Sequence, residues 1–397
     1  MMAAGTAISY GASVVLYEAM PLLGKKLGIT GKGRCNVTNA CSRDEFFNNV
    51  TKNPRFLYSA LNALSQEETM AFFEGLGVEL KTERGGRVFP TSDRARDIVD
   101  ALRKYSAGAE VRHEKVNEIN RLENGKYVIN RRSEEFDAVI LATGGKSYPL
   151  TGSDGSGYTL ARSLGHTVTK LIPSLIPITS PAPICKELQG LSLKNVAIKI
   201  IDASGKTVYT DFGEMMFTHF GVTGPVILSA SARIRELKIS SLTLSIDLKP
   251  ALDDKTLDKR LLHDFAENAN EDFINSLGDL LPAKLIEPFV RLTYIDPRKK
   301  VNSLTREERG RVLRLLKGIE IPLGQLRPID EAIITSGGIS VNEVRPSTME
   351  SKLSPRLYFA GEMLDVDAYT GGFNLQIAFS TGYLAGKNAA ESLFELE

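Results

Sequence analysis

The sequence predicts an α/β fold in which the two ends of the chain form one domain and the middle forms another. Residues 136–145, FDAVILATGG, are a continuous apolar run closed by two glycines, which is typical of a strand buried on both faces of a parallel sheet. Residues 355–390 predict a strand, a glycine-rich loop and a long helix. Between these segments, the four prolines of 171–184 indicate a domain crossing. The expected domains are 1–171 joined with 332–397, and an inserted domain over 172–331.

Composition and charge limit the kind of protein. The 397 residues, 42% of them hydrophobic and 24% charged, suit a folded chain of two or three domains. A formal charge of +1 creates no field that attracts nucleic acid or a membrane surface, and no run reaches the ~20 apolar residues of a membrane span. Three cysteines without C-x-x-C spacing predict a reducing, cytoplasmic setting with neither disulfides nor a metal site. We expect a small-molecule partner, no nucleic acid and no membrane, and the sequence leaves the oligomeric state open.

The first twenty residues, MMAAGTAISYGASVVLYEAM, predict the second half of a nucleotide-binding βαβ unit. A helix of small residues ends at Gly11, and the strand SVVLYE follows and ends in Glu18. In such a unit, the acid after the second strand accepts hydrogen bonds from the adenosine ribose. An ordinary exposed glutamate is the alternative. The first strand and its glycine loop would lie before Met1, and we expect their absence to weaken both folding and nucleotide binding.

Clear local signals begin at residue 54. Pro54 suits the first turn of a helix, and Ser65 with Glu68 predicts a capping box for a helix that ends near Gly75. Ser92 is the expected N-cap of the helix that follows the short strand GRVFP.

The later segments differ in composition. Asn124 and Gly125 lie between two alternating runs, which is the strongest short signal for a β-hairpin. Within the inserted domain, 172–250 predicts strands, whereas the charged segment 251–320 predicts helices. We expect three prolines to divide these helices: Pro282, Pro288 and Pro297.

A glycine-rich basic loop spans residues 24–39, GKKLGITGKGRCNVTN. Its glycines allow backbone N–H groups to approach phosphate oxygens, and its cations add charge-assisted hydrogen bonds. The alternative is a mobile basic loop. Cys35 lacks a partner at C-x-x-C spacing, so we expect a packed thiol. The cations are Lys25, Lys26, Lys32 and Arg34.

The most informative stretch lies near the C-terminus. Gly371 and Gly372 precede Asn374, the expected N-cap of a helix that runs to about residue 390. A helix N-terminus suits an anion or the N1–C2=O edge of a reduced flavin. Glu362 and Asp365 follow a strand at the edge where open α/β sheets bind ligands, and both carboxylates suit sugar hydroxyls. A glycine-rich turn capped for stability alone is the alternative.

His219 is a weaker catalytic candidate. It precedes a helix with Pro225 in its first turn, and it suits either an active-site acid or a structural histidine. The sequence contains neither a G-x-S-x-G motif nor a P-loop.

Six stretches together resemble a known family. In chain order they are GKKLGITGKGRCNVTN, GRVFP, ATGG, FTHFGVTGP, TSGGIS and GEMLDVDAYTGGFNLQIAFSTGYLAG. The chain is similar to bacterial NAD(P)/FAD-dependent oxidoreductases, a group that includes aminoacetone oxidase-type enzymes and flavin reductases of bile-acid dehydroxylation. The resemblance covers essentially the whole chain. It implies a glutathione-reductase-like FAD-binding Rossmann domain, interrupted by a β-barrel-like part and a helical part.

The resemblance also implies roles for individual residues. Glu18 would hold the adenosine ribose, and the backbone of Val116 would meet the adenine. Glu362 and Asp365 would hold the ribityl chain of the flavin. The other implied cofactor residues are Lys25, Lys26, Gly31, Gly33, Arg34 and Asn36 along the cofactor, Gly144 and Gly145 near the diphosphate, and Gly372, Asn374 and Leu375 at the flavin ring. Family members begin with a strand and a G-x-G-x-x-G loop, which this sequence lacks.

These features predict an FAD-dependent oxidoreductase that passes hydride between a donor such as NAD(P)H and a small organic substrate through flavin N5. The sequence holds only one dinucleotide-binding unit, so NAD(P)H would visit the flavin as a transient co-substrate. Two alternatives remain open: a flavin-dependent amine oxidase that uses oxygen, and a truncated flavin-binding protein without catalysis.

Overall fold

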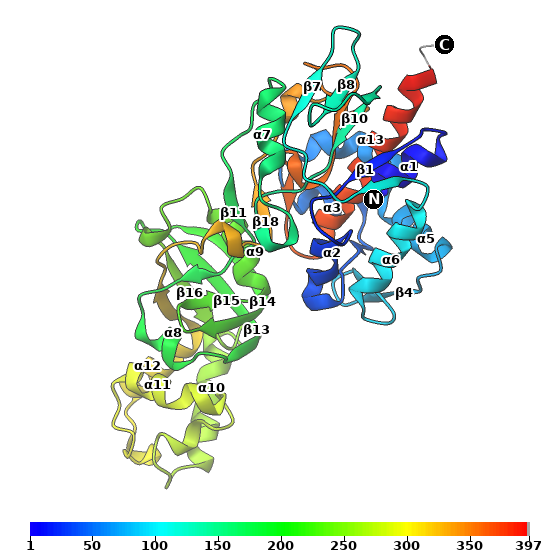
Figure 1. Ribbon diagram of the computed structural model, residues 1–397. Helices are drawn as coiled ribbons and strands as arrows, with labels where there is room; N and C mark the ends of the chain where they lie inside the picture. Colours follow the sequence, from blue (N-terminus) through cyan, green and yellow to red (C-terminus); the bar gives the residue numbers. More distant parts are fainter. Residues whose placement is uncertain (395–397) are drawn as a thin grey trace. The chain divides into compact units, whose positions relative to one another are not determined.

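The computed structural model describes residues 1–394 and divides into two compact units (Figure 1). Unit 1 comprises Met1–Ser174 and Pro328–Glu397, and unit 2 comprises Leu175–Arg327. The sequence analysis placed these boundaries at 172 and 331.

The N-terminal helix of unit 1 packs against its C-terminal helix. Helix α1 (Met2–Ser9) is followed by Gly11, whose φ of +90° ends the helix. Helix α13 (Phe373–Phe394), red in Figure 1, approaches α1 so closely that a Cβ on Gly386 would lie 2.3 Å from the carbonyl oxygen of Ala3. Glycine at this position therefore permits the two helices to meet.

Unit 1 contains two pairs of parallel strands, and each pair includes strands that the sequence predicted. Strand β1 (Val15–Tyr17) pairs with β6 (Glu110–Arg112), and β10 (Val139–Leu141) pairs with β19 (Leu357–Phe359). The ends of β10 and all of β19 are buried, which confirms the prediction of a covered parallel strand within FDAVILATGG.

The helices between β1 and β6 begin largely where the sequence predicts. Ser65 and Glu68 form the capping box of α5 (Gln66–Gly75), as expected. The expectation for Ser92 is wrong, because α6 (Ala95–Tyr105) has Arg94 as its N-cap. The Ser92 hydroxyl accepts a hydrogen bond from the Arg94 N–H at 3.3 Å and donates to the Asp97 carboxylate at 2.5 Å, so it holds the turn before the helix.

The predicted hairpin is confirmed. Strands β7 (Ile119–Arg121) and β8 (Tyr127–Ile129) are antiparallel, and Gly125 has a φ of +84° in the turn between them. The Asn124 side chain accepts a hydrogen bond from the Lys126 N–H at 3.0 Å.

The remaining elements of unit 1 are short. The sheet order β2-β5-β4 and the pairs β20–β3 and β11–β18 are antiparallel, and β9 extends the β7–β8 hairpin. The strands are β2 (Thr38–Asn39), β3 (Val50–Lys52), β4 (Leu80–Glu83), β5 (Arg87–Pro90), β9 (Glu135–Phe136), β11 (Ile172–Ser174), β18 (Ile334–Ser336) and β20 (Asp367–Ala368). The helices are α2 (Lys25–Ile29), α3 (Arg43–Asn48), α4 (Tyr58–Ala63) and α7 (Ser156–Ser163).

Unit 2 contains one six-stranded antiparallel sheet. Its order is β12-β15-β14-β13-β16-β17, and the segment after β17 returns to β12, where the N–H of Gly324 donates to the Thr179 carbonyl at 2.7 Å. This closure gives the barrel-like part that the resemblance implies. The strands are β12 (Ile178–Thr179), β13 (Ser192–Ile201), β14 (Thr207–Thr218), β15 (Gly221–Thr223), β16 (Thr243–Asp247) and β17 (Ile319–Pro322).

The helices of unit 2 correct one sequence expectation. Pro288 does not separate two helices but lies buried inside α11 (Ala283–Thr293). Proline lacks an N–H, so the helix loses one backbone hydrogen bond there. The packing of Leu285 and Phe289 in the core compensates for this loss. The other helices are α8 (Pro183–Glu187), α9 (Pro225–Ile234), α10 (Asp254–Glu267) and α12 (Arg306–Lys317). Among residues 1–394, no helix is long and apolar enough to cross a membrane.

A buried histidine of unit 1 is held in its neutral form. The Ser351 hydroxyl accepts hydrogen bonds from the N–H groups of Leu353 and Ser354, so its own proton is left to donate to Nε2 of His166, 2.8 Å away. Burial lowers the pKa of His166, and the charge of Glu343 opposes that shift only in part.

Neutral His166 makes folding pH-dependent. Because the unfolded chain binds this proton more readily, the stability from neutral His166 is complete above about pH 6.5 and is lost as the pH falls. In denaturant titrations, we expect His166→Gln to lose less unfolding free energy than the unaltered chain between about pH 7.5 and about pH 5.5. His263→Gln, at an exposed site, should keep the full dependence, whereas an unchanged dependence in His166→Gln would contradict this assignment.

Candidate functional site

A polar cluster surrounds Glu362, immediately after β19. Lys26 donates from Nζ to Oε2 of Glu362 at 2.8 Å and to the Ser147 hydroxyl at 2.8 Å. The other carboxylate oxygen accepts from the Thr335 N–H at 2.8 Å and from the Ser147 hydroxyl at 3.2 Å. The Lys26 and Glu362 side chains are 22% and 21% exposed, so solvent screens this ion pair only partly. A carboxylate has about four acceptor positions, and the protein uses three of them here.

Gly145 allows the backbone after β10 to lie against this cluster. A Cβ on Gly145 would stand 2.5 Å from the Thr335 hydroxyl and 2.8 Å from Oε1 of Glu362. The next N–H, of Lys146, donates to that hydroxyl at 2.7 Å. Gly144 has a φ of +78°, which glycine adopts without strain. The glycines of ATGG therefore bring the chain against Glu362.

Asp365 is paired with a different lysine. It is 4% exposed, and its Oδ1 lies 2.8 Å from Nζ of Lys52 on β3, an ion pair whose angle does not suit a hydrogen bond. The Tyr158 hydroxyl donates to the Glu362 carbonyl at 3.2 Å. Burial raises the pKa of this hydroxyl, and the charges of Glu362 and Asp365 raise it further. The structure thus brings the two predicted acids into one neighbourhood, each with its own cation. Sequence reasoning missed Lys52, which carries no local signal.

The backbone of the glycine-rich loop is unusual. Helix α2 occupies its beginning, so this part is not the open loop that the sequence predicted. Gly31, Lys32, Gly33 and Cys35 then adopt left-handed φ values of +58°, +59°, +84° and +59°. Left-handed backbone costs a non-glycine residue about 1–3 kcal/mol, so tertiary contacts hold this loop in place. The N–H of Cys35 closes it by donating to the Thr30 carbonyl at 3.0 Å.

Cys35 is a packed thiol, as predicted. It is fully buried, and burial raises the pKa of the thiol to about 12.

The cations of this loop have different surroundings. Arg34 is paired with Glu83 and Asp93, and its guanidinium lies 4.2 Å from the centre of the Phe89 ring. These partners hold the pKa of Arg34 above its usual range. Lys25 is exposed and forms no ion pair with the part of the chain that the structure describes. Within residues 1–394, Lys26 is the only one of the four predicted cations that contacts Glu362.

The start of α13 is pressed against the 36–39 segment. Gly371 and Gly372 have φ values of +125° and +100°, and a Cβ on Gly372 would lie 2.3 Å from the Thr38 carbonyl oxygen. The Gly372 carbonyl accepts the N–H of Gln376 at 3.1 Å, so the helical hydrogen bonds begin there. Only glycine fits both requirements at position 372.

Asn374 is not the N-cap that the sequence predicted. It lies inside the first turn of α13, where its carboxamide accepts the Ala368 N–H at 3.0 Å and donates to the Ala368 and Tyr369 carbonyls at 2.8 and 3.2 Å. Its side chain therefore fixes the loop before the helix. Leu375 beside it is half-buried and packs against a core that includes Phe379.

Gln376 links α13 to two other segments, β2 and α5, and sequence reasoning missed it. It is fully buried; the Thr38 hydroxyl donates to its Oε1 at 2.5 Å, and its Nε2 donates to the hydroxyls of Thr69 and Ser380 at 2.8 and 2.9 Å. A lone glutamine on a helix resembles a surface residue in sequence. Its partners are visible only in the fold.

Three buried polar atoms near these motifs have no hydrogen-bond partner within the described chain. They are Oδ1 of Asn36, in the glycine-rich loop, the hydroxyl of Ser336, at the end of β18, and Oδ1 of Asp365, which has only the Lys52 ammonium beside it. Buried polar atoms are nearly always paired, so these atoms call for a partner from outside the chain: a water molecule, an ion or a ligand.

The remaining predicted residues belong to other segments. Glu18 follows β1 and accepts the Met20 N–H at 2.8 Å, and Val116 is half-buried against the core that includes Leu141. His219 belongs to unit 2, where it is exposed in the turn between β14 and β15 with its ring edge on Phe220.

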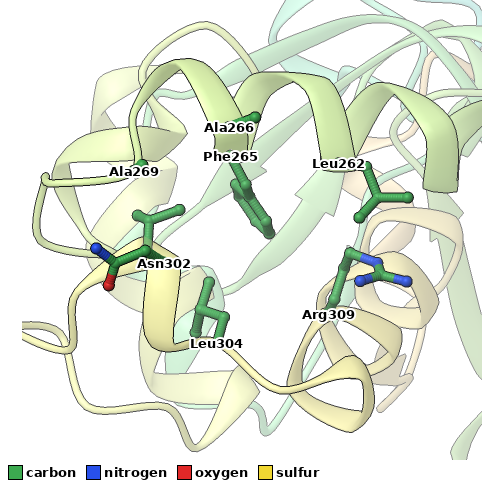
Figure 2. Close-up of a pocket in the computed structure, with 8 residues that line it drawn as sticks. Leu262, Phe265, Ala266, Ala269, Asn302, Leu304 and Arg309 are labelled. Atoms are coloured by element: carbon green, nitrogen blue, oxygen red, sulfur yellow. The ribbon is translucent and has the colours of Figure 1, made fainter.

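Unit 2 has a cavity of its own in its helical part. Figure 2 shows side chains of α10, of the segment before α12 and of α12 itself lining this space. Its volume is about 220 Å³. The lining is apolar apart from Asn302 and Arg309, and Arg309 pairs with Asp258 at 2.7 Å. None of the predicted site residues lines it.

Comparison with known proteins gives one family model and several relatives. The family described as HI0933-like protein Rossmann domain matches residues 1–388. The 3-dehydro-bile acid delta(4,6)-reductase of Clostridium scindens is 31% identical, over 96% of this chain and 93% of the relative. The ribosomal RNA dihydrouridine synthase of Escherichia coli is 29% identical, over 95% and 92%. Among solved structures, quinol fumarate reductase of Escherichia coli aligns with a TM-score of 0.49 at 15% identity, over 100% of this chain and 69% of that chain.

The two adjacent lysines provide a test of the Glu362 cluster. Lys26→Met leaves a half-buried carboxylate without its cation, and we expect it to lower the free energy of unfolding by about 1–3 kcal/mol. The exposed control Lys25→Met should change it by less than about 0.5 kcal/mol. Denaturant titration measures both, and equal effects would contradict the described pairing.

The contact at the start of α13 predicts a second difference. Gly372→Ala forces a Cβ onto the Thr38 carbonyl from a left-handed backbone, and we expect a loss of more than about 2 kcal/mol of unfolding free energy. Gly28→Ala, inside α2 with open space around its Cβ, should be neutral or stabilising. Thermal unfolding of the two variants distinguishes these outcomes; a neutral Gly372→Ala would refute the tight contact.

Proposed function

The chain belongs to the HI0933-like Rossmann family, and from this premise we propose that it is an FAD-dependent reductase of carbon–carbon double bonds conjugated with a carbonyl group. The names of two relatives support this reaction class. A delta(4,6)-reductase of a 3-dehydro bile acid and a dihydrouridine synthase each add two hydrogens across such a bond, in a steroid enone and in the uracil ring. Hydride addition at the carbon β to the carbonyl places charge on the carbonyl oxygen, and a proton completes the reduction.

The residues of unit 1 fit FAD. The N–H groups at the N-terminus of α13 would suit the carbonyl edge of a flavin ring. Oδ1 of Asn36 and the hydroxyl of Ser336 have no partner in the described chain and would be able to bond a ligand. When bound, FAD supplies hydride transfer at N5. One observation carries the proposal of an FAD site. Unit 1 contains both buried polar atoms without a hydrogen-bond partner and glycines at which the backbone lies close to neighbouring groups.

The chain's own residues have distinct roles in this proposal. Glu362 keeps one acceptor position for a ribityl hydroxyl, while Lys26 and Thr335 fix its orientation. The first turn of α13 would favour negative charge on a reduced flavin bound beside it, because the N–H groups of that turn carry partial positive charge. Gln376 anchors that turn from inside the core.

We further propose that the hydride donor is a nicotinamide, NADH or NADPH, and that the substrate is a small molecule. RNA-binding proteins usually carry a strongly basic surface, whereas this chain has a formal charge of only +1. The charge therefore favours a small-molecule substrate over RNA. A nicotinamide donor supplies the two electrons that the reduction of the double bond consumes.

Anaerobic spectroscopy tests the reductase. We expect NADH or NADPH to bleach the visible absorption of the FAD-loaded chain, and a 3-oxo-4-ene steroid to restore it while gaining two hydrogens by mass spectrometry. Free FAD is the control. Bleaching by an amine alone, with recovery on adding oxygen, would replace the reductase with an amine oxidase. Restoration only by uracil in ribosomal RNA would keep the reaction class and overturn the small-molecule substrate.

A further inference from the structure

Unit 2 contains a second cavity, lined by β13, by the two residues after β16 and by the segment before α11. Its volume is about 310 Å³, at the lower end of the ~300–1,000 Å³ of small-ligand pockets. Six of its nine lining residues are apolar, three are polar, and none is an acid. They are Ser192, Leu193, Lys194 and Val196 of β13, then Leu248 and Lys249, and finally Leu280, Leu281 and Pro282.

A β-bulge shapes β13 at this cavity. The pairing with β14 shifts between Leu193 and Val196, so that two residues of β13 stand opposite one residue of β14. Asn195, inside the bulge, has a left-handed φ of +55°. A regular strand turns residues three apart to opposite faces, whereas Leu193 and Val196 are both buried here. Lys194, between them, is exposed and lines the cavity.

Lys249 is the unusual residue of this lining. It is half-buried, and its Nζ forms no hydrogen bond or ion pair with residues 1–394. An ammonium group has three donors, so its burial costs free energy unless an acceptor is near. Burial accordingly lowers the pKa of Lys249, the charge of Arg260 lowers it further, and the charge of Asp264 opposes the shift only in part.

The acids near Lys249 already have cations of their own. Asp247 lies 2.5 Å from Nζ of Lys317. Asp264 lies 3.4 Å from Nε of Arg260, one turn away on α10. The cavity is therefore lined by two amines, while the acids around it are engaged with other side chains.

We propose that this cavity binds a small organic acid, with its carboxylate at the ammonium group of Lys249 and its apolar body against the leucines. A carboxylate is both an acceptor and a counter-charge, so it supplies the two things that half-buried Lys249 lacks. The apolar lining favours an apolar body, because binding removes that body from water. Exposed Lys194 adds a weaker attraction, which solvent screens. All lining residues belong to unit 2, and the inference does not depend on the proposed function.

The cavity of Figure 2 carries no such inference. Its cation, Arg309, donates to both carboxylate oxygens of Asp258, at 2.7 and 3.4 Å. The charge of Arg309 is therefore compensated within the protein and does not call for an anion.

Three probes that differ in one property each test the site. Octanoate has a carboxylate and an apolar body, octanamide has a neutral amide in place of the carboxylate, and acetate lacks the body. In calorimetric titrations of the full chain with FAD present, we expect octanoate to bind roughly tenfold more tightly than octanamide or acetate. Equal affinity for octanoate and octanamide would overturn the carboxylate contact.

Variants locate the binding. Lys249→Met removes the ammonium group, and we expect it to bind octanoate about tenfold more weakly and to lose the preference over octanamide. Lys255 is exposed and does not line the cavity, so Lys255→Met should bind as the unaltered chain does. Ser192→Phe, which adds a ring at an exposed lining position, should weaken octanoate and octanamide alike. Unchanged octanoate affinity in Lys249→Met would overturn the inference.

Stability without the acid separates a binding role from a structural one. Because Nζ of Lys249 has no partner in the described chain, Lys249→Met should unfold at the same temperature as the unaltered chain or at a higher one. Octanoate should raise the unfolding temperature of the unaltered chain and of Lys255→Met more than that of Lys249→Met. A Lys249→Met variant that unfolds at a clearly lower temperature without octanoate would instead make Lys249 a structural residue.

Discussion

The contact between the start of α13 and the 36–39 segment is the constraint on which the rest of unit 1 depends. Gly372 meets the Thr38 carbonyl with no room for a side chain, and the buried amide of Gln376 joins Thr38 to Thr69 and Ser380. A buried amide whose groups are paired fixes one arrangement, because any shift would leave one of them unpaired. The first turn of α13 and the glycine-rich loop are therefore held in one fixed relation.

The Glu362 cluster provides the second fixed point. Lys26, Thr335 and Ser147 come from three separate segments and converge on one carboxylate that follows β19. Gly145 permits that convergence, since a Cβ there would collide with the Thr335 side chain and with the Glu362 carboxylate itself. Both fixed points use glycine to bring the backbone close and a polar side chain, buried Gln376 in one and half-buried Glu362 in the other, to hold it there.

The sequence predicted those features that depend on local chemistry. The Ser65 capping box, the Asn124-Gly125 turn and the buried strand before Gly144 each carry their signal within a few residues. Asn374 and Ser92 were assigned wrong roles, because a side chain that caps a helix and one that holds a preceding turn have similar local patterns. The partners of Gln376 and the lysine beside Asp365 could not be predicted, since they come from distant segments that only the fold brings together. The expectation of FAD came from the family resemblance, because the periodicity of the sequence does not identify a cofactor.

The central claim is that unit 1 holds FAD between these two fixed points. The most direct measurement is the ratio of flavin to protein after the full chain is incubated with FAD and freed of excess cofactor by gel filtration. We predict one flavin per chain, with a visible spectrum shifted from that of free FAD. A folded chain that elutes without flavin would contradict the account.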